Sequence, residues 1–178
     1  MPLDNNTLAA FTTHQDAFSA AEVSSGGGGA RWPDEGIHDA YINGITVDPQ
    51  AEFFLGGGNS IPAVKITFEY ELADDPESPE NPLSWPGEPF SLPMNPADIN
   101  HPGHKQRYEI GLSRLKSHLN VLLGDQFADN LAADIQSAVS KVEGEASVLA
   151  KVFCKHKPKK GDPTTIYKTD FLRELVTG

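Results

Sequence analysis

The chain has only one cysteine among its 178 residues, Cys154, so it cannot form an intrachain disulfide, and we expect a reducing, cytoplasmic environment. It has no run of about 20 apolar residues that would predict a transmembrane helix. Its N-terminal segment contains acidic but no basic residues, which is not typical of a secretory signal. Basic residues are also scarce, with 14 against 25 acidic ones and a net charge of −11. This balance argues against a surface that coats DNA indiscriminately.

Motifs of common catalytic sites are absent as well. The sequence contains no GxSxG, HExxH or CxxC motif and no P-loop lysine, so we expect neither an enzyme nor a bound cofactor. One zinc hypothesis stays open, because His101 and His104 together with Cys154 and His156 would supply four ligands. Against it, Cys154 lies in a small apolar pattern that is more typical of a core position.

The basic residues that are present gather in one segment. Residues 151–168 contain six lysines and one acid, Asp162, for a net charge of +5, whereas the other 160 residues carry −16. A local positive strip on an acidic protein indicates an anionic partner. Phe153 and Tyr167 lie among these lysines. Because lysines neutralise phosphates and aromatic rings stack on bases, the segment favours single-stranded nucleic acid over a merely solvated hairpin.

The pattern along the chain predicts an N-terminal arm and one folded domain. Residues 1–31 are expected to be a flexible arm that ends in a glycine-rich linker, and 32–178 to be the domain. Residues 40–47 and 61–72 alternate between apolar and polar side chains, which predicts two strands. We interpret 48–60, with its phenylalanines and glycines, as a loop between them.

A proline-rich segment and two helices follow. Residues 73–104 are too rich in proline for helix over most of their length, although 90–94 predicts a short strand. Trp85 in this segment is expected to cap the core, with contact to a ligand as the alternative. Apolar residues at steps of three and four predict helices over 105–123 and 130–142. The element after them, 146–154, has small apolar residues at its even positions, which suit the inside of a tight barrel.

The last strand is predicted over about 165–172, and it forms a hairpin with 146–154. Phe153 lies on the outward side of this hairpin between Lys151 and Lys155. We therefore expect Phe153→Ala to weaken binding about tenfold or more, since stacking contributes about 1–3 kcal/mol per base. If Phe153 instead packs under a helix or a partner subunit, the same change would lower the melting temperature and spare binding.

This order of elements resembles the oligonucleotide-binding (OB) fold. The resemblance implies a mainly β chain with helices, in which a five-stranded Greek-key barrel has its helical insertion between strands 3 and 4. It also implies that ligand is held by the loops between strands 1 and 2 and between strands 4 and 5. These loops correspond to residues 48–60 and 156–164 in this sequence.

The chain also resembles the single-stranded DNA-binding proteins of bacteriophages. The resemblance lies in the segments GIHDAYI (36–42), IPAVKITF (61–68) and VLAKVFCK (148–155), and in the element order over about 36–175. It differs from many such proteins in its last residues, FLRELVTG, which are not an acidic tail. The resemblance implies a protein of the host-cell cytoplasm that protects single-stranded DNA during replication or recombination and that has proteins of these processes as further partners.

We therefore predict contacts with single-stranded DNA by the aromatic and lysine side chains of these elements. They are Phe53, Phe54, Lys65, Lys151, Phe153, Lys155, Lys157, Lys159, Lys160, Tyr167 and Lys168. No membrane contact is expected, and the sequence leaves the oligomeric state open. The alternative is a virion, scaffold or adaptor protein that uses the proline-rich segment and the N-terminal arm for protein contacts.

Overall fold

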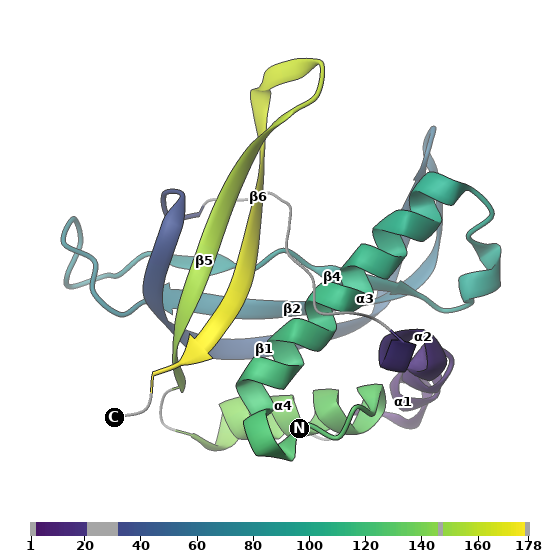
Figure 1. Cartoon of the computed structure of the whole chain (residues 1–178), viewed down its shortest axis with the longest axis horizontal. Coiled ribbons are helices and arrows are strands. Elements are labelled where there is room, and N and C mark those ends of the chain that lie inside the picture. The colour runs from purple at the N-terminus through teal and green to yellow at the C-terminus, as the bar shows by residue number, and fades with distance from the viewer. Residues whose placement is uncertain (1–2, 21–31, 146–147, 177–178) are drawn as a thin grey trace.

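The computed structural model describes residues 3–20, 32–145 and 148–176, and its centre is a curled antiparallel sheet (Figure 1). The middle strand is β1 (Gly36–Gly56). It pairs along most of its length with β2 (Asn59–Leu72) and, through its first seven residues, with β5 (Val148–Lys159). Irregularities in the β1–β2 register after Ile42, Asp48 and Phe54 bend the long strand, because each one adds local twist.

The third strand of the sheet is interrupted. β3 (Ser84–Pro86) and β4 (Phe90–Pro93) both pair with β2, at its C-terminal half and at its middle. Pro86 and Pro89 flank the break, and prolines supply no N–H for a strand ladder. The sheet thus has six strands in place of the five predicted, and the short strand expected over 90–94 is confirmed as β4.

The sheet is a half-barrel. β6 (Asp162–Leu175) pairs with β5 at one edge. Within the described ranges, no ladder joins β6 to β3 or β4, so the sheet does not close into a full barrel. In place of a ladder, the Asp170 side chain of β6 accepts a hydrogen bond at 2.7 Å from Glu88 N, which lies between β3 and β4. The mainly β architecture with helices between the third strand and β5 is confirmed.

Two segments that were interpreted as loops are strands. Residues 48–60 belong to the β1–β2 hairpin, which turns through Gly57 and Gly58, both with positive φ. Likewise, most of 156–164 belongs to the β5–β6 hairpin, which turns at Lys160 and Gly161. In both places, pairing with the neighbouring strand continues beyond the apolar alternation that the sequence displays.

Two long helices cover the concave side of the sheet. α3 (Pro102–Leu123) begins three residues before the predicted start, because the His101 side chain accepts a hydrogen bond from Gly103 N at 3.1 Å and Pro102 suits the first turn. α4 (Leu131–Gly144) starts at the cap Asn130, whose side chain accepts from Ala133 N at 3.0 Å.

The N-terminal segment is not a free arm over its described part. Residues 3–20 contain α1 (Asn5–Thr12) and α2 (Gln15–Ala20), and Phe11 and Phe18 are fully buried. Phe18 lies 6.3 Å from the Phe127 ring, between ring centroids. The glycine-rich linker lies outside the described residues.

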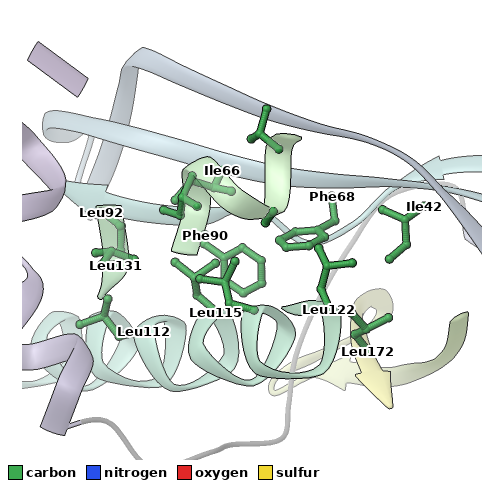
Figure 2. Packing of buried hydrophobic residues seen from close by; sticks show 14 of the residues in the cluster. Ile42, Ile66, Phe68, Phe90, Leu92, Leu112, Leu115, Leu122, Leu131 and Leu172 are labelled. Atoms are coloured by element: carbon green, nitrogen blue, oxygen red, sulfur yellow. The ribbon is translucent and has the colours of Figure 1, made fainter. Parts of the chain in front are cut away.

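The core lies between α3 and the curled sheet. Figure 2 shows Leu112, Leu115 and Leu122 of α3 facing side chains of β2 and β4 such as Phe68 and Phe90. Each fully buried side chain of this size contributes about 1.5–3 kcal/mol of transfer free energy. The inward parity predicted for 146–154 is confirmed for the even positions of this range that the structure describes, which are buried: Val148, Ala150, Val152 and Cys154. Trp85 is buried and stacks on Tyr70 at 5.3 Å, as expected for a residue that caps the core.

Candidate nucleic-acid interface

The β5–β6 hairpin projects beyond the rest of the sheet (Figure 1). Pairing with β1 ends at Cys154, whereas β5 and β6 continue to pair with each other as far as Lys159 and Asp162. The projecting part exposes the side chains of four lysines: Lys155, Lys157, Lys159 and Lys160. Its tip is ordered by Asp162, which accepts hydrogen bonds from the hydroxyls of Thr164 and Thr165 at 2.6 and 2.7 Å. These bonds lower the pKa of Asp162.

The predicted lysines differ in their neighbours. Lys65 lies 3.8 Å from the Asp48 carboxylate, and Lys151 lies between Asp39 and Glu174 at 3.7 and 3.4 Å. In the part of the chain that the structure describes, the hairpin lysines 155, 157, 159, 160 and 168 form no such pair. These lysines are therefore not engaged in ion pairs, and their charges are available to an anion that approaches the hairpin.

Phe153 is half-buried on the side of the sheet opposite the core. The strand register aligns it with Ile37 of β1 and Phe171 of β6. Its ring centroid lies 6.0 Å from that of Phe171, and the Arg173 guanidinium lies 5.2 Å from it. Part of the Phe153 ring thus packs against Phe171 and Arg173 of the neighbouring strand, and part of it faces solvent next to the exposed Ile37.

The two neighbouring phenylalanines of β1 have opposite environments. Phe53 is only 3% exposed, so the prediction that it offers a stacking face is wrong. Successive side chains of a strand point to opposite sides, and Phe53 points to the core, where the Arg107 guanidinium covers its ring at 4.3 Å. Phe54 is 63% exposed and stays available for a ligand. Its backbone carbonyl accepts a hydrogen bond from Arg107.

A depression of about 600 Å³ lies beside the hairpin. It is bounded by the end of β1, the segment 88–91, one side of α3 and Tyr167 of β6. Tyr167 is 44% exposed, and it lies directly across from Lys157 in the strand register. The depression therefore joins Phe54 and Tyr167, two of the predicted contact residues, to the lysine hairpin.

Sequence reasoning missed the α3 side of this depression. Gly103, Arg107 and Gly111 recur at steps of four, and Ile110 and Arg114 continue the same side of the helix. This second stripe, with two glycines that leave room beside an arginine, was visible in the sequence. The core stripe of leucines on the same helix gave the stronger periodic signal.

A buried polar network anchors the base of the hairpin. The Asp170 carboxylate accepts hydrogen bonds from the Tyr70 hydroxyl at 2.9 Å, from His118 Nε2 at 2.9 Å and from Glu88 N at 2.7 Å. The other nitrogen of His118, Nδ1, lies 2.9 Å from the Arg114 carbonyl, so both ring nitrogens face acceptors. Arg114 in turn donates to the Glu88 carbonyl at 2.9 Å and pairs with the Glu88 carboxylate.

The charges of this network shift its ionisation. Burial alone would raise the pKa of Asp170, but the hydrogen bond and charge of His118 and the charge of Arg114 hold it below the usual range. Burial and the Asp170 charge raise the pKa of Tyr70 well above its usual value, so its hydroxyl keeps the proton that it donates. The network links β6, β2, α3 and the segment at Glu88, and it takes the place of a strand ladder at the open side of the sheet.

The four candidate zinc ligands lie apart. His101 caps α3, with the His104 ring 5.0 Å away, whereas Cys154 is buried in the sheet and His156 Nε2 contacts the Pro33 carbonyl at 3.1 Å. Over residues 3–20, 32–145 and 148–176, no three histidine, cysteine or acidic side chains are arranged to hold a metal ion.

In comparisons with known proteins, no family model, curated protein or solved structure matches the chain. Within the described residues, no helix has both the length and the apolar character needed to cross a membrane.

Proposed function

We propose that the protein binds single-stranded DNA with little sequence preference and protects it during phage-type replication or recombination, without catalysing a reaction. The observation that carries this proposal is the projecting hairpin, whose five unpaired lysines stand on a protein with a net charge of −11. A row of lysines along a narrow projection creates a local positive field that attracts a phosphate backbone. The acidic residues elsewhere on the protein weaken this field only slightly because they are distant.

Single strands are favoured over duplex by the aromatic side chains beside the lysines. Tyr167 and Phe54 are exposed, and Phe153 is half-buried next to Lys155. Stacking on such rings requires bases that are not already stacked in a duplex. No feature among these residues favours a 2′-hydroxyl, so we propose DNA as the ligand before RNA.

The fold that fits this function is a partly open OB barrel. β3 and β4 together act as its third strand, and β5 and β6 as its fourth and fifth. The pairings β1–β2, β1–β5 and β5–β6 support this assignment, as does the position of the helices. Asp170 spans the place where the third and fifth strands of a closed barrel would pair.

A salt titration tests the proposal. We expect a labelled oligo-dT to bind more tightly than duplex DNA or oligo-U, with affinity that falls steeply as salt rises. The triple variant Lys157→Gln, Lys159→Gln, Lys160→Gln should reduce the slope of log affinity against log salt by up to about 2, at roughly 0.7 per lost phosphate contact. Preferential binding to duplex, or no binding to any of the three ligands, would contradict the proposal.

A matched triple variant controls for the change in net charge. Lys65→Gln, Lys141→Gln and Lys151→Gln remove the same three charges from lysines that already face carboxylates. Because their charges are locally offset, this variant should lower the slope by less than about 1. Equal slopes for the two triple variants would mean that the hairpin lysines contribute no more than the paired lysines, which contradicts the hairpin as the main binding site. Phe153→Ala, in the protein with all its lysines, should weaken binding about tenfold.

A further inference from the structure

Three of the six described residues whose large apolar side chains are exposed line the depression beside the hairpin. They are Phe54, Ile110 and Tyr167. Exposed apolar groups are common singly, but their convergence on one concavity indicates a binding site. A volume of about 600 Å³ lies within the range of small-ligand pockets and is ample for one nucleotide.

The charges that line the depression disfavour a phosphate in it. Its two arginines are already engaged, since Arg107 lies over Phe53 and donates to Phe54 O, and Arg114 is paired with Glu88. Glu52 also lines the depression, is exposed and has no ion pair within the described part of the chain. A negative acceptor beside apolar walls suits a neutral, flat ligand that carries N–H donors.

We propose that this depression, which we name the base pocket, holds one unstacked base of the bound strand and that Glu52 selects bases with an exocyclic amino group. This inference rests on the proposed function and adds a base preference to it. Lys157 lies across from Tyr167 in the strand register, so a phosphate on the lysine and a base in the pocket belong to neighbouring positions of one strand.

The chemistry of the pyrimidines makes the preference measurable. Cytosine presents its N4 amino group to an acceptor, and glutamate accepting from this group is a common contact. Thymine presents the O4 oxygen at the same place, which a carboxylate repels. Oligo-dC should therefore bind about fivefold more tightly than oligo-dT, near the lower end expected for one such contact at an exposed site.

Binding of oligo-dC and oligo-dT of equal length, near pH 8 and at one salt concentration, tests the inference. Both are pyrimidine strands of the same charge, so contributions from backbone charge and most contributions from base stacking cancel in the ratio of their affinities. We expect Glu52→Ala to bring the ratio close to 1. Glu109→Ala, which removes the same charge from an exposed residue of α3 that does not line the pocket, should keep the wild-type ratio.

Two results would overturn the base pocket while leaving the proposed function intact. One is tight binding of both strands by the wild-type protein with a ratio near 1. The other is a preference for oligo-dC that persists in Glu52→Ala. If neither strand binds the folded wild-type protein, the proposed function is refuted, and the base pocket with it.

Discussion

Replacing Asp170 with asparagine should destabilise the protein strongly. The carboxylate is fully buried and receives three hydrogen bonds, from Tyr70, His118 and Glu88 N. Asparagine removes the negative charge and keeps only one of the two oxygens that accept these hydrogen bonds. The buried Arg114 also loses a nearby negative charge.

Removing one partner of a buried charged network costs about 3–5 kcal/mol. For a domain of this size, each kcal/mol lowers the melting temperature by about 2–4 °C, so we expect a decrease of roughly 6–20 °C. Urea unfolding followed by tryptophan fluorescence measures the change directly. Trp85 is a suitable probe because it is buried and stacks on Tyr70, a member of the network.

The pH dependence distinguishes loss of the charge from a packing defect. The pKa of Asp170 is lowered in the folded protein, so its contribution is present above the unfolded value of about 3.9 and is lost as pH falls through the folded value. The difference in unfolding free energy between wild type and Asp170→Asn should therefore hold at neutral pH and narrow in acid. Asp74→Asn, the same change at an exposed position, should alter stability by less than about 0.5 kcal/mol. A difference below about 1 kcal/mol for Asp170→Asn at neutral pH would refute this reasoning.

Two further predictions concern single side chains. Phe53→Ala should lower the unfolding free energy by about 3–5 kcal/mol, because it leaves a cavity at a buried site. Phe54→Ala should leave stability unchanged and weaken DNA binding. Equal losses of stability for the two variants in urea unfolding would contradict this assignment. Burial lowers the pKa of His14 from 6.5 to about 4, so the unfolded state binds the proton first and wild-type stability should fall as pH drops from 6.5 to 4. His14→Gln should reduce this pH-dependent loss of unfolding free energy by up to about 3 kcal/mol, at roughly 1.4 kcal/mol per pH unit. If the melting temperature of the variant depends on pH as that of the wild type does, the prediction is wrong.

The sequence by itself determined the elements whose pattern is local. The leucines of α3 recur at helical spacing, the residues of β2 alternate, and the small apolar residues of β5 share one parity, so each element follows from its own side chains. The concentration of lysines in one hairpin is likewise a property of the sequence. These signals were sufficient to predict a mainly β chain with helices between the third strand and β5, and to predict a candidate basic surface.

Only the tertiary structure decided which of the candidate residues are accessible and what holds the hairpin in place. Phe53 and Phe54 are equivalent in the sequence, but Arg107 of a distant helix covers one and leaves the other exposed. The partners of Asp170 lie 52, 82 and 100 residues away along the chain. No local pattern specifies such contacts, because burial depends on which elements meet, and the meeting of elements is decided by packing of the whole core.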